Sequence, residues 1–353
     1  GSNPQRRIID MSSQSAQAAR WRSKFFSPWH QDTPSVRKSE VSSMLNSRAR
    51  GWKNGSEKWN EADWALMRAN AAIQSFPNMT AAAITTHATD VREMPTHTPR
   101  YSKPTPDPMQ NTFDYFQYTR LPMGQPVLIC HRSQDGAWYY VETPLVSGWV
   151  DAKDVATVSP AFEASWEGSR LGAIVREHVP LNGSEAYIGT VLPMVSTSSV
   201  YVPVAGSDGS ASPRAVPVPD GTVNTMPIAM TPANFARLGN QILGQHYGWG
   251  GMLGLRDCSA MTRDLMTPFG IWLPRNSRSQ GRVGYPTSLA GMSSAEKEAT
   301  LQRSGVPFAT LVVMNGHVVL YIGTYEGRPA IMHDLWGIRV DEPADEDQRL
   351  IIG

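Results

Sequence analysis

The pattern of hydrophobic and polar positions changes character several times along the chain. Residues 1–108 have the composition of helices joined by irregular segments, and the stretches 35–50 and 60–76 are the helix candidates. In the second stretch the apolar positions partly follow one helix face, at Trp64, Leu66, Met67, Ala71 and Ile73. Repeated prolines in residues 95–108 predict an extended linker. We therefore expect a mainly helical and irregular N-terminal segment.

Short strands replace helices from residue 109 onward. Between residues 109 and 160 we predict strands at 126–131, 137–142, 147–151 and 155–158. Asp135-Gly136 is a turn signal between the first two, and short strands with tight turns are typical of a small barrel. Residues 161–228 predict a second small barrel, with strands at 171–175, 186–195, 199–205 and 215–219.

Residues 229–353 mix helices with strands. Thr231-Pro232 begins one predicted helix, which extends to Gly244, and an amphipathic helix follows Cys258. The predicted strands come after these helices, at residues 308–314, 317–324, 328–333 and 338–340. Helices followed by a run of antiparallel strands predict an α+β domain. The whole chain is thus expected to be multidomain, with a helical start, two small barrels and a C-terminal α+β domain.

Size, charge and cysteine content narrow the functional class. At 353 residues the chain is long enough for about two to four domains. Its 32 Lys and Arg residues nearly balance 31 Asp and Glu residues, which argues against a basic nucleic-acid-binding surface. It has no apolar run long enough to predict a membrane span. Two cysteines, Cys130 and Cys258, make no disulfide framework, and no Cys and His cluster predicts a metal site.

The surroundings of Cys258 are the strongest chemical signal in the chain. This cysteine follows the glycine-rich stretch 247–251 and opens a predicted helix, whose positive N-terminal end favours a thiolate. His317 follows the turn signal Asn315-Gly316 at the start of a predicted strand, and His333 ends the next strand. A thiol, a base and a group that orients the base are the parts that nucleophilic catalysis needs. Cys130, in contrast, is expected in a barrel core, and its neighbour His131 on the surface.

These residues predict a separate catalytic role for each side chain. Cys258 attacks an amide carbonyl, while His317 holds the thiolate as an ion pair and then protonates the leaving amine. His333 fixes the tautomer of His317, although the adjacent Asp334 is an alternative orienting group. The backbone N–H of Cys258 and the hydroxyl of Tyr247 are the expected oxyanion donors.

Two families are suggested by these motifs. The order Asp135-Gly-Ala-Trp-Tyr-Tyr-Val141, followed by Gly148-Trp-Val150, resembles a bacterial SH3 domain. The region of about residues 235–345 resembles the NlpC/P60 family of papain-like cysteine peptidases. That resemblance is carried by Tyr247-Gly-Trp-Gly-Gly251, Asp257-Cys258-Ser259, Leu273-Pro-Arg-Asn-Ser277 with Gln280, Gly316-His317-Val318 with Gly323, and His333. Ala260 departs from the glycine usual in the family, which leaves the chemistry undisturbed.

The resemblance implies an architecture and a substrate. An N-terminal stabilising segment (1–108), two bacterial SH3 domains (109–160 and 161–228) and a peptidase (229–353) form a known arrangement. Such enzymes cleave peptidoglycan stem peptides between γ-D-glutamate and an L-centre such as that of meso-diaminopimelate, without a cofactor or metal. By the same resemblance, the expected substrate contacts are Asp257, Ser259 and Ser277, while Arg275 supports the site. We also expect export to the periplasm or cell wall, with a signal removed before the tag-like Gly1-Ser2-Asn3.

One departure from the resemblance bears on substrate size. Relatives that recycle free peptides carry an acidic residue and a tyrosine just before the Gly-Trp of the first SH3 domain. Here the stretch is residues 142–149, with Val146 where the tyrosine falls. We therefore predict a lysin that acts on intact peptidoglycan. The alternatives are a recycling enzyme for free L-Ala-γ-D-Glu-diaminopimelate, a catalytically silent wall-binding protein, and an acyltransferase or amidase with the same triad.

Overall fold

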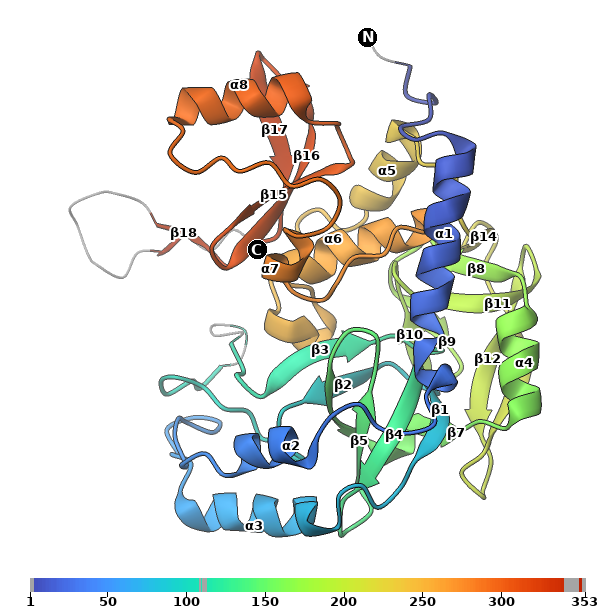
Figure 1. The fold of residues 1–353 in the computed structure, drawn as a ribbon, viewed down its shortest axis with the longest axis vertical. Coiled ribbons are helices and arrows are strands. Elements are labelled where there is room, and N and C mark those ends of the chain that lie inside the picture. Colours follow the sequence, from blue (N-terminus) through green and yellow to red (C-terminus); the bar gives the residue numbers. More distant parts are fainter. Residues whose placement is uncertain (1–2, 108, 110–112, 340–348, 351–353) are drawn as a thin grey trace.

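A computed structural model gives the fold of the chain and describes residues 3–107, 109, 113–339 and 349–350. In Figure 1 the N-terminus and the C-terminal domain lie toward the upper end of the molecule, and the first β unit lies at the lower end. None of the helices in the described ranges is long and apolar enough to cross a membrane.

The N-terminal segment is helical, as the composition predicts. Its helices are α1 (Met11–Phe25), η1 (Ser27–His30), α2 (Lys38–Leu45), α3 (Glu61–Ala71) and η2 (Ile73–Ser75). The two predicted helices are confirmed as α2 and α3. Helix α1 runs beside both the β unit of residues 171–225 and the C-terminal domain (Figure 1), where the buried Gln14 side chain donates to the carbonyls of Ile228 and Phe269 at 2.7 and 3.0 Å. The segment thus ties distant parts of the chain together.

The first barrel is a seven-stranded antiparallel sheet in the order β3-β2-β6-β5-β4-β1-β7. Its strands are β1 (Ala81–Thr85), β2 (Thr89–Arg92), β3 (Gln117–Leu121), β4 (Pro126–Arg132), β5 (Trp138–Glu142), β6 (Ser147–Asp151) and β7 (Val155–Thr157). Strands β1 and β2 come from the part that we assigned to the helical segment, so a boundary at residue 109 cuts through the sheet. Strand β1 pairs with β4 and β7, and such distant pairing leaves no local signal.

One surface expectation in this barrel is wrong. Cys130 lies in the core, as expected, but His131 is fully buried as well. The His131 ring is packed against Phe76 and Trp149, and its Nε2 is 2.8 Å from the carbonyl oxygen of Ala71. The carbonyl satisfies the imidazole, which removes the cost of burying a polar group.

The second β unit follows helix α4 (Pro160–Gly168). Its main sheet has the order β13-β12-β11-β8-β14, and β9 and β10 form a separate hairpin. The strands are β8 (Leu171–Ile174), β9 (Val179–Leu181), β10 (Ser184–Ala186), β11 (Val191–Ser196), β12 (Ser199–Ala205), β13 (Ala211–Pro217) and β14 (Val223–Thr225). Val175 and Ile188 of this unit belong to the same hydrophobic cluster as Leu265 of the C-terminal domain, so the two parts pack against each other.

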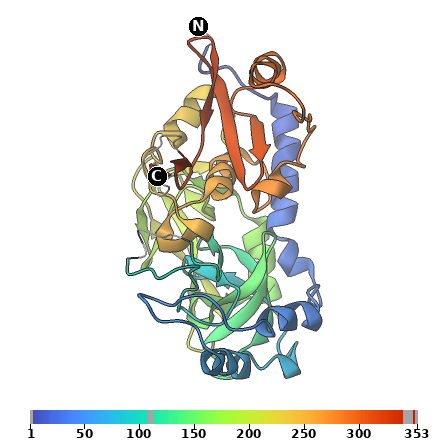
Figure 2. The same cartoon turned by 90° about the vertical axis from the view of Figure 1, so that its left-hand side faces the viewer.

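The C-terminal domain has the predicted α+β composition, with helices followed by an antiparallel sheet in the order β15-β16-β17. Its elements are α5 (Pro232–Gly239), η5 (Trp249–Gly254), α6 (Cys258–Met266), η6 (Thr267–Phe269), α7 (Ser277–Gln280), α8 (Ser294–Ser304), β15 (Thr310–Met314), β16 (His317–Tyr325), β17 (Arg328–Met332), β18 (Ile338–Arg339) and β19 (Arg349–Leu350). Every residue of α6 is buried, between this sheet and the barrels (Figures 1 and 2). The N-terminus of α6 is therefore held from several sides.

Candidate active site

The glycine-rich loop before the nucleophile lies directly against the first barrel. Gly250 and Gly251 have φ values of 62° and 83°, in the region where side chains are strained. A Cβ atom on Gly250 would stand 2.7 Å from the carbonyl oxygen of Gln117 in β3. The Gln117 side chain also donates to the Gly250 carbonyl at 3.1 Å. The sequence predicted the loop, but only the fold shows that glycine is needed for contact with the barrel.

Cys258 is the first residue of α6, and Asp257 caps the helix. The Asp257 Oδ1 atom accepts the Ala260 backbone N–H at 2.9 Å, and Oδ2 accepts that of Gly250 at 3.0 Å. One carboxylate thus holds both the helix start and the preceding loop. The Cys258 residue itself is only 6% exposed.

The two histidines meet as the sequence predicts. His317 begins β16 and His333 directly follows β17, and His317 Nε2 is 3.1 Å from His333 Nδ1. Between the two candidates for an orienting group, His333 is the one that hydrogen-bonds to His317. Because Nε2 is engaged, Nδ1 is the ring nitrogen of His317 left for the thiol. The backbone N–H of Val318 donates to the Cys258 sulfur, which places the start of β16 at the nucleophile.

The expectation of a resting thiolate is wrong. Burial raises the pKa of the Cys258 thiol to about 11, and the negative charge of Asp257 adds to this, against the Val318 N–H. Burial also lowers the pKa of His317, as does the neighbouring His333, whose own pKa burial lowers. The resting site therefore favours a neutral thiol beside neutral imidazoles. Loss of hydration and a nearby carboxylate outweigh the backbone N–H groups of Val318 and Ser259 at the sulfur.

The expected substrate contacts lie in two different environments. Asp257 is buried and receives two hydrogen bonds from Arg275, from Nη1 to Oδ1 at 3.1 Å and from Nη2 to Oδ2 at 2.6 Å. Ser259 is also buried, and its hydroxyl lies between Asp257 and Arg275 at 3.0 and 2.9 Å. Ser277 begins the short helix α7 and is half-buried. The geometry gives Asp257 and Ser259 a supporting role, and substrate contact by these three residues stays a prediction.

A cluster of aromatic rings lies on one side of the expected oxyanion donor, Tyr247. Tyr247 is buried, and burial, together with the charges of Asp257, Cys258 and Asp334, raises its pKa, so its hydroxyl keeps the proton. The ring centroid of Phe113, from the first barrel region, is 5.8 Å from that of Tyr247 and 5.5 Å from those of Trp249 and Trp336. Tyr247 is thus held as a donor in an apolar wall.

Asp334 has a different place from the one considered in the sequence. Burial and the charge of Asp257 raise the pKa of Asp334 to about 7, against the opposing effect of Arg256. Its charge also acts on Cys258 and Tyr247. Asp334 is therefore an ionisable neighbour of the nucleophile.

Sequence reasoning missed the residues of the barrels that complete this site. Gln117 and Thr119 in β3 contact the glycine loop and Arg275, and Glu177 of the second β unit forms an ion pair with Arg256 at 2.8 Å. No local motif marks them. Among the described residues, no group of three or more His, Cys, Asp or Glu side chains is arranged to hold a metal ion.

A thiol at a helix N-terminus and a hydrogen-bonded histidine pair at the adjoining strands define the core of a cysteine peptidase. Family comparisons agree: residues 1–76 match the N-terminal NlpC/P60 stabilising domain, residues 99–151 an SH3 domain of the SH3b1 type, and residues 244–344 the NlpC/P60 family. Residues 244–344 thus form a cysteine peptidase domain of the NlpC/P60 family, and the family's stabilising domain and an SH3b domain precede it in the chain.

One solved structure shares the fold over nearly the whole chain. An NlpC/P60 endopeptidase from Photobacterium damselae subsp. piscicida has a TM-score of 0.87 and 24% sequence identity, over 99% of this chain and 86% of its own. An NlpC/P60 family protein from Bacillus cereus has a TM-score of 0.47 and 21% identity, over 75% of this chain and 96% of its own. A comparison with curated protein sequences gives no match.

Proposed function

We propose that the protein is a DL-endopeptidase that cleaves the bond between γ-D-glutamate and the L-centre of a diamino acid in peptidoglycan stem peptides. The observation that carries the proposal is the contact of His317 with His333 at 3.1 Å, with the Val318 N–H at the Cys258 sulfur. This arrangement supports acyl transfer from an amide to a thiol. The match of residues 244–344 to the NlpC/P60 family supports a peptidoglycan stem peptide as the substrate.

The protonation states favour general-base activation over a preformed ion pair. As the Cys258 sulfur attacks the amide carbonyl, Nδ1 of His317 accepts the thiol proton, and His333 holds the resulting imidazolium. The Cys258 backbone N–H and the Tyr247 hydroxyl donate to the oxyanion. His317 then returns the proton to the leaving amine, and a water molecule, deprotonated by His317, hydrolyses the thioester.

A mutational series tests this mechanism. Cys258→Ala should abolish release of soluble peptides from purified wall material, whereas Cys130→Ala, which removes the other cysteine, should retain the cleavage chemistry. His333→Phe should lower kcat by roughly 10²–10⁴-fold, the usual contribution of acid–base catalysis, and Asn in its place should restore part of the loss. Cleavage by Cys258→Ala would remove the assigned nucleophile.

We infer further that the substrate is intact peptidoglycan, so that the enzyme acts as an exported wall lysin. Glu142, the acidic residue of the 142–149 stretch, is buried, and its carboxylate accepts the Ser35 hydroxyl and the Val36 backbone N–H, both at 2.7 Å. Both oxygens of this carboxylate are therefore engaged by the N-terminal segment, and Glu142 is not free to bind a peptide amine. Val146 supplies no hydroxyl.

The substrate assignment is tested by offering two substrates to the same enzyme. Purified sacculi and free L-Ala-γ-D-Glu-diaminopimelate are incubated separately, and mass spectrometry identifies the products and the bond that was cut. We expect soluble fragments from sacculi and slower cleavage of the free peptide. Rapid cleavage of the free peptide without release from sacculi would reverse the assignment in favour of recycling.

A further inference from the structure

We propose that Thr119, in strand β3 of the first barrel, is a positioning residue of the active site. It holds Arg275, which in turn fixes Asp257 and the start of the nucleophile helix. The first barrel would thereby supply part of the catalytic framework. This inference rests on the proposed function, but one of its tests reads the nucleophile directly.

The hydrogen bonds form a chain from the barrel to the residue beside Cys258. Arg275 Nε donates to Thr119 Oγ1 at 2.7 Å, and the other end of the guanidinium holds both oxygens of Asp257. Thr119 is 1% exposed, so it acts through Arg275 and does not touch substrate. A planar guanidinium with three anchored nitrogens has one orientation, and the Thr119 hydroxyl sets it from the barrel side.

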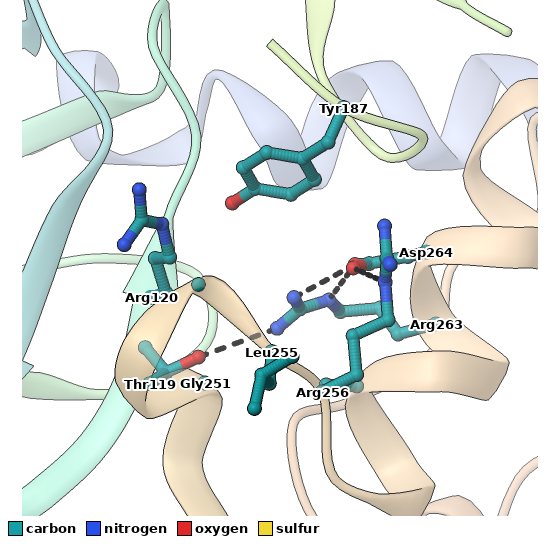
Figure 3. A pocket seen from close by; sticks show the side chains of 10 residues that line it. Thr119, Arg120, Tyr187, Gly251, Leu255, Arg256, Arg263 and Asp264 are labelled. Atoms are coloured by element: carbon teal, nitrogen blue, oxygen red, sulfur yellow. Dashed lines mark hydrogen bonds and ion pairs between the residues drawn. The ribbon is translucent and has the colours of Figure 1, made fainter. Parts of the chain in front are cut away.

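The same hydroxyl faces a second cation at the junction between the domains. Arg263 Nη1 lies 3.5 Å from Thr119 Oγ1, and the guanidinium of Arg263 also binds Asp264 at 2.8 and 3.0 Å (Figure 3). Arg120 and Tyr187 line the same pocket, and Figure 3 shows the Arg120 guanidinium pointing away from Arg263. Thr119 therefore accepts from two buried arginines, and a side chain of the same shape without oxygen would leave both without this acceptor.

Strand β3 also holds the loop on the other side of Asp257. The Gln117 side chain donates to the Gly250 carbonyl at 3.1 Å, and the Gly250 N–H donates to Asp257 Oδ2 at 3.0 Å. Two residues of one strand thus reach the same carboxylate, through Arg275 and through Gly250. Because Cys258 directly follows Asp257, a shift of this carboxylate moves the nucleophile, and small misplacements are costly in catalysis.

The test compares four single variants of the full-length protein and one double variant. Thr119→Val removes the acceptor and keeps the shape, and Thr119→Ser keeps the acceptor. The control is Thr89→Val in the same sheet, since the buried Thr89 hydroxyl donates to Asp154 at 2.9 Å and has no bond to Arg275. Arg275→Lys keeps a cation near Asp257 but cannot hold both partners.

We expect Thr119→Val to lower kcat by about 10–100-fold with KM within about threefold, a split that indicates misplacement of reacting groups. Thr119→Ser should stay near the wild type, and Thr89→Val should keep kcat even where its melting temperature falls. Arg275→Lys should lose kcat by a similar factor, and adding Thr119→Val to it should cost little more, because both act through one contact. If Thr119→Val does not fold, the test is the comparison of kcat between Arg275→Lys and Thr119→Ser.

A second readout does not depend on the substrate. The rate at which iodoacetamide alkylates Cys258, measured against pH, should change in Thr119→Val and stay unchanged in Thr89→Val. Equal kcat and equal alkylation profiles for Thr119→Val and the wild type would overturn the positioning role. An altered alkylation profile in an enzyme that cleaves no wall peptide would support the positioning role and refute the proposed function.

Discussion

Replacing Arg256 by methionine should break a buried ion pair between the C-terminal domain and the second β unit. The Arg256 guanidinium binds Glu177 at 2.9 and 2.8 Å and Asp264 at 2.9 Å, and all three side chains are buried. It also donates to Gln245 and to the carbonyl of Ile188. Methionine fills a similar volume and offers no donor, so two buried carboxylates lose their shared partner.

The loss of stability in Arg256→Met depends on the partners that Asp264 and Glu177 keep. Asp264 keeps Arg263 at 2.8 Å, but Glu177 has lost its cation and retains only the Ile188 N–H and the Gln245 amide. Breaking a buried ion pair from one side costs about 3–5 kcal/mol, because an uncompensated charge stays buried. For a cooperative unit of roughly 150–250 residues, this corresponds to a fall in melting temperature of at least about 6 °C.

Thermal unfolding followed by circular dichroism measures this fall, with Arg328→Met as the matched control. Arg328 also binds a carboxylate, Glu298 at 2.7 Å, but it is 77% exposed, so its loss should leave the melting temperature nearly unchanged. Adding Glu177→Gln to Arg256→Met should recover part of the stability. Equal, small shifts for both arginine variants would refute the argument that burial makes the Arg256 contact strong.

The contribution of the Arg256–Glu177 ion pair to stability should depend on pH. Burial pushes the pKa of Glu177 upward, but Arg256 pulls it further down, so the net pKa is lowered. A lowered carboxyl pKa stabilises the fold above the unfolded value of 4.5, and this stabilisation is lost as the pH falls through the folded value. The advantage of the wild type over Arg256→Met should therefore shrink in acid. An advantage that grows as the pH falls below 4 would contradict this assignment.

Three further predictions concern the active site. Because burial raises the pKa of Cys258 to about 11, its alkylation should accelerate about tenfold per pH unit between pH 7 and 10, and a plateau below pH 7 would disprove a neutral resting thiol. Burial raises the pKa of Asp334 to about 7, so the protonated side chain stabilises the fold fully below its unfolded pKa of 3.8, and this stabilisation is lost as the pH rises through 7. The melting temperature of the wild type should therefore fall relative to that of Asp334→Asn between pH 5 and 8. Parallel melting curves against pH would count against this assignment. Gly250→Ala should lower kcat far more than Gly254→Ala, because both have positive φ but only a Gly250 Cβ meets backbone, at 2.7 Å; similar losses would mean that the close contact with Gln117 is unimportant.

The parts of the site that lie within one short stretch were predictable. A glycine-rich loop, a cysteine at a helix start and histidines beside two strands each leave a local pattern, and the structure has α6, β16 and β17 where that pattern predicts them. The pairing of His317 with His333 was also within reach, because consecutive antiparallel strands are neighbours.

The charge state of the nucleophile was not predictable in the same way. The helix N-terminus suggested a thiolate, whereas the burial of Cys258 beside Asp257 gives a neutral thiol. The same holds for His131, which reads as a surface residue in sequence and is buried against the Ala71 carbonyl. Burial depends on which surfaces the folded domains cover, and this is a property of the tertiary structure.

By itself, the sequence determined the kinds of element, their order and the reactive groups, because these depend on residue type and local periodicity. The tertiary structure decided what surrounds those groups: Thr119 and Gln117 beside the nucleophile loop, Glu177 on Arg256, and strands β1 and β2 in the first barrel. These partners are far apart along the chain. Their contacts form only when separate domains bury their surfaces against one another. Local periodicity in the sequence does not indicate which surfaces these are.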